Sequence, residues 1–266
     1  MNLDATVRYL TVTNNKKRYI TTYKNNNQGH ELRIQHKYFV NYLTETSFDK
    51  FNSDFAYAYL KEKSPKKLVE KHLQHNYFLC LDIKSFFESI DLNILKQKAN
   101  FLVTKNFPQA KLDNLIESCQ VPKKDNGLAI GLIPSALFSN IYLQDFDKQL
   151  NNFLLKINTN FVYTRYSDDL FISLNTSFDD LVIKKEVIKL LAELGLVIHS
   201  DKTRYKEFKT KGDHLKILGL NIVKGEFSNH VSVSRKYKKK FKQERKTNVK
   251  KGMNNYITYN QIINML

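Results

Sequence analysis

Two adjacent aspartates, Asp168 and Asp169, stand between two runs of β-branched and aromatic residues, Phe161 to Tyr166 and Leu170 to Leu174. This pattern predicts a strand, a tight turn and a second strand, with both carboxylates at the tip of the hairpin. Their like charges repel each other, so a positive partner is expected beside them, and hard divalent cations prefer carboxylate oxygens. An ordinary turn is the competing interpretation, because Asp is common in turns.

A third carboxylate, Asp82, interrupts an apolar run that begins at Tyr77. The run predicts a buried strand, and a carboxylate there is costly unless it is paired or binds a metal ion. Capping of the following helix is the alternative. If this strand lies beside the hairpin, the three carboxylates converge. Such a cluster suits two divalent cations about 3.5–4 Å apart, which support in-line phosphoryl transfer.

The composition indicates a folded, basic protein. The chain has 266 residues, 42% of them hydrophobic, and a formal charge of +17 from 43 Lys and Arg against 26 Asp and Glu. This excess favours a polyanionic partner, with nucleic acid first and a membrane surface second. No apolar run is long enough to span a membrane, and the N-terminus lacks a signal pattern. Cys80 and Cys119 fit free thiols in a reducing compartment, so we expect a cytoplasmic protein without membrane contact.

The elements that must position the carboxylates alternate between strands and helices. Tyr19–Tyr23 and Leu32–Gln35 are expected to form strands of a basic hairpin. Ser64 and Pro65 predict the start of a helix, and Pro134 predicts another. Together with the buried strands, these elements indicate an α+β fold.

Three further patterns have open interpretations. Gly127 and Gly131 would allow the backbone to approach a ligand, or would simply form the entry to the helix at Pro134. His72 and His75 are three residues apart on a helix, but no Cys or carboxylate completes a metal site, which favours a structural role. The segment from Leu215 to Ile222 is expected to be one strand.

In this order, the motifs resemble those of a reverse transcriptase over roughly residues 16–250. The segment from Leu81 to Phe87 resembles the first catalytic motif, and Tyr166-Ser167-Asp168-Asp169 resembles the Tyr-x-Asp-Asp box. The segment from Gly195 to Thr203 resembles the helix and strand motif that follows, and Leu218-Gly219-Leu220 resembles the primer-grip strand. Among subfamilies, the chain is most similar to bacterial retron-type enzymes, including retron, abortive-infection and defence-associated groups.

This resemblance implies a right-hand polymerase. Fingers are expected in residues 1–75 with part of 91–135. A palm, with an antiparallel sheet backed by helices and the catalytic aspartates, is expected in residues 76–225. A short, basic, helical thumb is expected in residues 226–266. The implied function is an RNA-directed DNA polymerase that makes DNA from dNTPs on an associated non-coding RNA in anti-phage defence.

The resemblance also implies roles for individual residues. Asp82, Asp168 and Asp169 would bind two Mg²⁺ ions, or Mn²⁺ as a substitute, with the Ile83 carbonyl as an extra ligand. The implied nucleotide-binding residues are Phe87 as a gate against the ribose 2′-hydroxyl, Ile130, Gly131, Lys202 near the triphosphate, and Arg33 in the fingers, with Lys24 as a weaker candidate there.

Two departures from the family pattern leave alternatives open. The usual Pro-Gln-Gly is replaced by Ala129-Ile130-Gly131, which raises template-independent or protein-primed DNA synthesis as an alternative. The thumb is abbreviated, so a protein partner or a second copy is expected to complete it. Residues 235–251 hold ten Lys or Arg and one acid, and the nucleic-acid contacts expected there are Lys236, Lys239, Lys240 and Arg245. A catalytically silent RNA-binding subunit of a defence complex is the alternative from another class.

Overall fold

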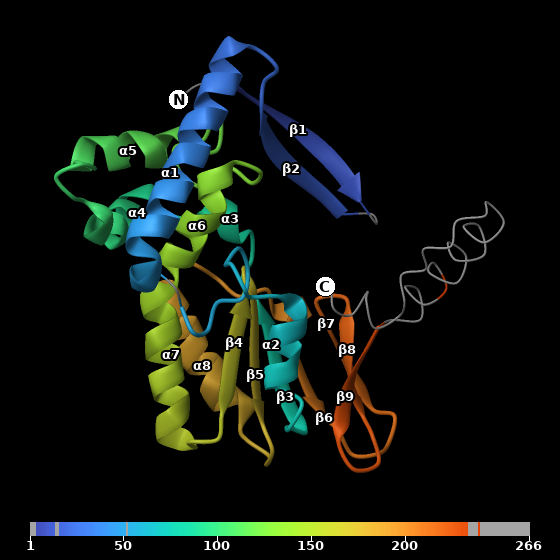
Figure 1. Ribbon diagram of the computed structural model, residues 1–266. Coiled ribbons are helices and arrows are strands. Elements are labelled where there is room, and N and C mark those ends of the chain that lie inside the picture. The colour runs from blue at the N-terminus through green and yellow to red at the C-terminus, as the bar shows by residue number, and fades with distance from the viewer. Residues whose placement is uncertain (1–3, 14–15, 52, 234–238, 240–266) are drawn as a thin grey trace.

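The computed structural model describes residues 4–13, 16–51, 53–233 and 239 (Figure 1). Its strands are β1 Thr6–Thr13, β2 Lys16–Tyr23, β3 Tyr77–Asp82, β4 Val162–Tyr166, β5 Asp169–Leu174, β6 Arg204–Glu207, β7 His214–Ile217, β8 Leu220–Lys224 and β9 Asn229–Val233. Its helices are α1 Asn27–Phe51, α2 Pro65–Lys71, α3 Phe86–Ser89, α4 Leu92–Lys98, α5 Gln109–Ser118, α6 Ile133–Tyr142, α7 Gln144–Ile157 and α8 Asp180–Ala192, with 3₁₀ turns η1 Ala99–Leu102 and η2 Ser200–Lys202.

A four-stranded antiparallel sheet in the order β4-β5-β3-β6 forms the centre of the molecule. Successive residues of β3 point to opposite faces, as the period of a strand requires. Leu79 and Leu81 join the core shared with α7 and α8, whereas Phe78 and Cys80 join a second core beneath α2 and the β7-β8-β9 sheet (Figure 1). Burial on both faces explains why β3 is a nearly continuous apolar run.

The expected helix start at Ser64 and Pro65 is confirmed, and similar local signals set the other helix boundaries near this sheet. Ser64 caps α2, with its side chain accepting a hydrogen bond from the Lys67 backbone N–H. Asp91 caps α4 in the same way, because its carboxylate accepts from two backbone N–H groups. Gly195 follows α8 with a φ of +67°, a conformation that suits glycine at the end of a helix.

Two predicted strands are wrong. Leu32–Gln35 lies inside α1, where Leu32, His36, Phe39 and Leu43 are buried at helical spacing. The segment from Leu215 to Ile222 is a hairpin rather than one strand, because it turns at Leu218 and Gly219, which have φ values of +50° and +87°. In both cases the prediction used a short run of alternating apolar and polar residues. Such a run does not show how the longer segment around it packs.

The remaining elements form a separate region above the sheet (Figure 1). The β1–β2 hairpin extends from it, and α1 packs against α6. Both cysteines are buried and unpaired, as expected. Among the described residues, no helix is both long enough and apolar enough to cross a membrane.

Candidate active site

The fold brings the three predicted carboxylates to one end of the central sheet. Asp82 is the last residue of β3 and pairs directly with Asp169, the first residue of β5. The Ile83 N–H donates to the Asp168 carbonyl oxygen at 2.9 Å, which fixes the turn of the β4–β5 hairpin against the end of β3. The expected convergence of these residues therefore follows from the strand register.

The carboxylates of this end of the sheet are poorly neutralised. Burial raises the pKa of Asp169 to about 7, and the neighbouring charges of Asp168 and Asp82 add to the shift. Burial also raises the pKa of Asp168, with Asp82 again adding to it, whereas Lys202 and Arg18 act in the opposite direction. The site thus favours any ligand that supplies positive charge.

Lys202 supplies the positive charge that directly contacts this cluster. Its Nζ lies 2.7 Å from the Asp82 Oδ1, and the lysine side chain is 45% exposed. A pocket of about 320 Å³ opens beside this pair, and its lining includes Asp82, Asp169, Asp201, Lys202 and Arg204. The pocket therefore has both acidic and basic walls, which suits a ligand that brings cations and phosphate groups together.

The donor atoms suit a hard cation, although the carboxylates are not arranged around one. Carboxylate and carbonyl oxygens are the ligands that Mg²⁺ prefers. Within the described part of the chain, no three His, Cys, Asp or Glu side chains are close enough together to hold a metal ion as they stand. The Asp82 oxygen instead faces the Lys202 ammonium group. The oxygen ligands available here therefore fit a divalent cation. In this structure the Lys202 ammonium group occupies the position beside Asp82 that such a cation would take.

A buried ion pair lies behind the β4–β5 turn and was missed by sequence reasoning. Arg165 of β4 and Asp147 of α7 are both fully buried, and the guanidinium donates from Nε and Nη2 to the two carboxylate oxygens at 2.8 and 2.7 Å. The third nitrogen, Nη1, donates to the Ser167 carbonyl oxygen at 3.1 Å. Ser167 has a φ of +57°, so Arg165 anchors a turn residue in the left-handed region.

The two glycines approach protein backbone rather than open space for a ligand. A Cβ at Gly131 would lie 2.4 Å from the Thr21 carbonyl oxygen, and one at Gly127 would lie 2.7 Å from the Glu88 carbonyl oxygen. The Thr21 N–H also donates to the Ile130 carbonyl oxygen at 2.7 Å. These glycines therefore let β2 and α3 pack closely against the loop that precedes α6.

Phe87, the expected gate, lies in α3 and is half-buried against the core. Its ring makes an edge contact with Tyr59, with centroids 6.5 Å apart, and Leu128 N–H donates to its carbonyl oxygen. The aromatic ring therefore contacts Tyr59 and Phe86, while the backbone of Phe87 is fixed to the loop that contains Ile130.

The basic residues expected to contact nucleotide or nucleic acid are more scattered. Arg33 is exposed on α1, and Lys24 lies between β2 and α1. Arg18 of β2, which sequence reasoning did not select, acts on Asp168 through its charge. Lys239 is exposed, whereas the other expected thumb contacts lie outside the described residues: Lys236, Lys240 and Arg245.

His72 and His75 have structural roles. The His72 ring forms hydrogen bonds with Ser173 Oγ at 2.6 Å and Thr164 Oγ1 at 2.7 Å, and His75 shares Ser173 at 2.7 Å. Burial lowers the pKa of His72 to about 3, so this ring is neutral near pH 7. Through these hydroxyl partners the two rings connect the end of α2 to the central sheet.

Comparisons with known proteins agree with this geometry. The retron Ec73 reverse transcriptase of Escherichia coli is 25% identical over 195 residues, which cover 70% of this chain and 60% of that protein. The fold is similar to that of an apo telomerase from Candida tropicalis truncated from its C-terminal domain, with a TM-score of 0.58, 14% identity, and coverage of 85% of this chain and 54% of that chain. A telomerase from Candida albicans, in complex with a fragment of telomeric RNA, gives a TM-score of 0.55 and 14% identity over 86% of this chain and 45% of that chain.

These comparisons confirm both the expected α+β polymerase fold and the expected resemblance to retron-type enzymes. The chain spans 60% or less of the length of each of these relatives. The family described as reverse transcriptase (RNA-dependent DNA polymerase) matches residues 14–222. The chain therefore belongs to the reverse transcriptase family.

Proposed function

We propose that this chain is an RNA-directed DNA polymerase, a nucleotidyltransferase that extends a DNA 3′-hydroxyl with dNTPs. The observation that carries the proposal is the convergence of three acidic residues at the paired ends of β3 and β5. The raised pKa values of Asp168 and Asp169, and the position of Asp82 next to Lys202, suit a reaction whose substrates bring cations and a triphosphate into the same pocket.

The proposed chemistry is phosphoryl transfer with two divalent cations. When bound, Mg²⁺, with Mn²⁺ as a substitute, would lower the pKa of the attacking 3′-hydroxyl and neutralise the triphosphate and the leaving pyrophosphate. Asp82, Asp168 and Asp169 would hold the two ions, with the Ile83 carbonyl as an extra ligand. Lys202 already lies 2.7 Å from Asp82 and would transfer its contact to the triphosphate or protonate pyrophosphate.

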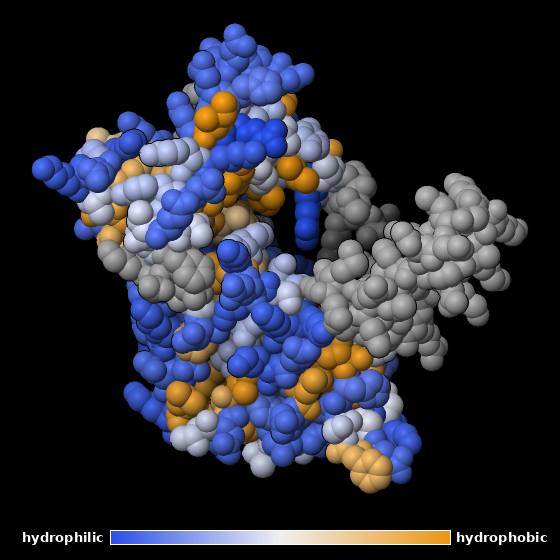
Figure 2. All heavy atoms as spheres, viewed as in Figure 1, coloured by the Kyte–Doolittle hydropathy of each residue, from blue (hydrophilic) through white to orange (hydrophobic). Residues whose placement is uncertain are grey.

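Residues around this centre would select the nucleotide. Phe87 would exclude a ribose 2′-hydroxyl by steric contact, supported from behind by Tyr59. Arg18 would bind the triphosphate from the β1–β2 hairpin, because its charge already acts on Asp168. The surface viewed in Figure 2 is hollowed beneath this hairpin, which leaves room for a substrate between hairpin and sheet. Arg33 and Lys24 remain candidates for phosphate contact nearer the base of the hairpin.

The proposed partners follow from the charge and the family. The template would be an associated non-coding RNA, the product DNA, and the biological role anti-phage defence in the cytoplasm. Residues 1–75 with part of 91–135 would act as fingers, 76–225 as the palm and 226–266 as part of a thumb, and a protein partner or a second copy would contribute to the grip on nucleic acid. The +17 charge supports the nucleic-acid partners.

The test is primer extension with the purified full chain. We expect dNTP incorporation on an RNA template with Mg²⁺, and none with the Asp168→Asn/Asp169→Asn variant. Lys156→Gln, on the exposed side of α7, is the matched control and should extend the primer normally. A fully active double aspartate variant would contradict the metal assignment. RNA binding without incorporation under any metal would favour the silent RNA-binding subunit.

Template-independent synthesis is the second candidate. The observation that favours it is Ile130, an apolar residue where the family usually has glutamine, on a loop fixed to β2 by the hydrogen bond from Thr21. Sequencing the product of the same reaction separates the two functions. A product complementary to the supplied RNA supports templated synthesis, whereas a homopolymer or random product, especially one attached to protein, supports the alternative.

A further inference from the structure

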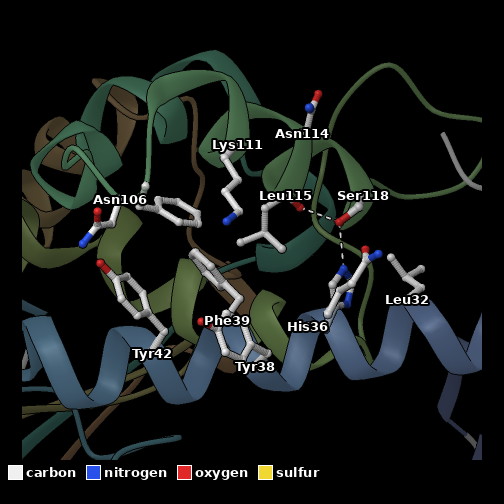
Figure 3. A pocket seen from close by; sticks show the side chains of 12 residues that line it. Leu32, His36, Tyr38, Phe39, Tyr42, Asn106, Lys111, Asn114, Leu115 and Ser118 are labelled. Carbon is white, nitrogen blue, oxygen red and sulfur yellow. Dashed lines mark hydrogen bonds between the residues drawn. The ribbon is translucent and has the colours of Figure 1, made fainter.

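A groove of about 680 Å³ lies between α1 and α5, and it shares none of its lining residues with the candidate active site (Figure 3). From α1, Tyr38, Phe39 and Tyr42 extend toward it, and Lys111 of α5 points into it from the opposite wall. Its volume lies in the range of small-ligand sites. Tyr38 is 69% exposed, so one aromatic ring at the groove is available to a ligand.

The lining combines flat aromatic surface with amide groups and one cation. Phe107 stacks with Tyr42, with ring centroids 6.0 Å apart and planes inclined by 29°, and it also contacts Phe39 at 4.7 Å. The amides of Gln35, Asn106 and Asn114 line the same space. Aromatic faces stack on nucleobases, and amides can pair with the polar edges of a base.

The charges at the groove favour an anionic ligand. Of the described residues that line the groove, Lys111 alone is charged and none is acidic; the Lys111 Nζ lies 5.6 Å from the centroid of the Phe107 ring. The acids of α5 are engaged elsewhere, since Gln109 donates to Asp113 and Lys96 pairs with Glu117 at 2.7 Å. In the described part of the chain, Lys111 forms no ion pair, so its ammonium is available to a phosphate.

The floor of the groove is already ordered. His36 shares hydrogen bonds of 2.8 Å with Tyr23 Oη and Ser118 Oγ, and Ser118 donates to the Leu115 carbonyl oxygen at 2.6 Å (Figure 3). Burial lowers the pKa of His36 to about 4, so the ring carries one proton. The Ser118 hydroxyl donates its proton to the Leu115 carbonyl oxygen, so it can only accept from His36. The His36 Nε2–H therefore donates to Ser118 Oγ, and His36 Nδ1 accepts from the Tyr23 hydroxyl. A site with a preformed floor costs little ordering on binding.

We propose that this groove binds one base and the adjacent phosphate of single-stranded RNA, with the base on the exposed ring of Tyr38, which the buried Phe107 does not offer, and the phosphate on Lys111. An apolar helix fits the lining less well, because it would bury the amides and the ammonium without partners. The proposal rests on the proposed function in that RNA is already the expected partner. It adds a second contact outside the polymerase centre.

The experiment measures binding of a short fluorescein-labelled oligouridine to the full chain by anisotropy, with the polymerase centre first saturated by a chain-terminated primer–template. Tyr38→Ala and Lys111→Ala should each weaken binding by roughly tenfold, as expected for loss of one stacked base or one phosphate contact. Both side chains are exposed, so neither variant threatens folding. Ile34→Ala is the matched control, because Ile34 is 66% exposed on the same helix but does not line the groove.

Crosslinking with 4-thiouridine RNA under the same conditions should label the peptide that contains Tyr38, the exposed ring of the groove. Equal affinity of both groove variants and wild type would overturn the proposal, as would crosslinks confined to the palm. A change in self-association with unchanged RNA affinity would also overturn it, in favour of a second copy of the chain. Primer extension by the same variants, on a separately supplied primer–template, tests the proposed function independently.

Discussion

The buried carboxylate of Asp147 and the half-buried carboxylates of Asp168 and Asp169 form two groups at the β4–β5 hairpin, and the environments of these two groups are opposite. Asp147 is fully buried and accepts hydrogen bonds from Arg165, from Tyr163 at 2.7 Å and from Ser53 at 3.4 Å. Burial instead raises the pKa values of Asp168 and Asp169, and at Asp168 a backbone hydrogen bond only partly opposes this shift. A carboxylate whose partners are complete stabilises the fold, whereas an under-neutralised one is available for a ligand.

The two groups are also mechanically connected. Arg165 joins them, since its Nη1 donates to Ser167 while its other nitrogens bind Asp147. Asn140 supports the same nitrogen at 3.2 Å and is itself held by a hydrogen bond to the Ala58 carbonyl oxygen. The fully hydrogen-bonded Asp147 therefore acts through Arg165 to fix the backbone of the turn that carries Asp168 and Asp169.

The largest contrast comes from Asp169→Asn. It should reduce primer extension by roughly 10³-fold or more, because the cations contribute several kcal/mol of transition-state stabilisation. The same change removes a repelling charge, so the melting temperature of metal-free protein should rise by about 2–5 °C. Calorimetry in EDTA and primer extension in Mg²⁺ measure the two effects. A lower melting temperature together with lost activity would contradict the comparison, because it would make Asp169 a structural carboxylate.

Asp147→Leu should act in the opposite direction. It leaves the Arg165 charge buried without its partner, which should lower the free energy of unfolding by about 3–5 kcal/mol. Adding Arg165→Met should recover most of that loss, since an apolar pair of similar volume replaces the ions. Urea unfolding of the two variants and wild type provides the measurement. If Asp147→Leu alone unfolds at the same urea concentration as wild type, the ion pair between Arg165 and Asp147 does not stabilise the fold.

The acidic centre could be predicted from the sequence because the signals for it lie within short segments of the chain. Asp82 ends an apolar strand and Asp168 and Asp169 follow another, so residue type and strand period indicate both chemistry and position. Arg165 and Asp147 carry no such signal. They are 18 residues apart on a strand and a helix, and only the packing of α7 against β4 brings them together.

Errors in the prediction have the same origin. Leu32–Gln35 has the alternation of a strand, but α6 buries one helical face of the longer segment around it. Gly131 indicated a close approach correctly, and the approaching group is the backbone of β2 rather than a ligand. In the sequence, nothing distinguishes Arg18 from the other basic residues of the β1–β2 hairpin. Its proximity to Asp168 emerges only from the position of the hairpin in the fold. Long-range contacts therefore decide what local patterns leave open.

Arg165→Lys tests the connection between the two groups. Lysine keeps the charge but lacks the planar fork that reaches both Asp147 and Ser167, so the turn should lose its anchor. We expect kcat to fall about 10- to 100-fold with KM for dNTP nearly unchanged, because the reacting groups are displaced while the nucleotide pocket persists. Tyr163→Phe is the matched control, since it removes a hydrogen bond to Asp147 without contacting Ser167. An equal loss of kcat in both variants would reduce Arg165 to a stability role.

The acidic centre should also give metal-free protein a pH-dependent stability. The pKa of Asp169 is raised from its usual 3.8 to about 7 in the folded chain, so the folded state binds this proton more tightly than the unfolded state. The resulting stability is fully present below about pH 4 and is lost as the pH rises toward 7. The melting temperature of metal-free wild type should therefore decline over this range more than that of Asp169→Asn. Calorimetry in EDTA at matched ionic strength compares the two curves, and parallel curves would show that Asp169 is already neutralised without a ligand.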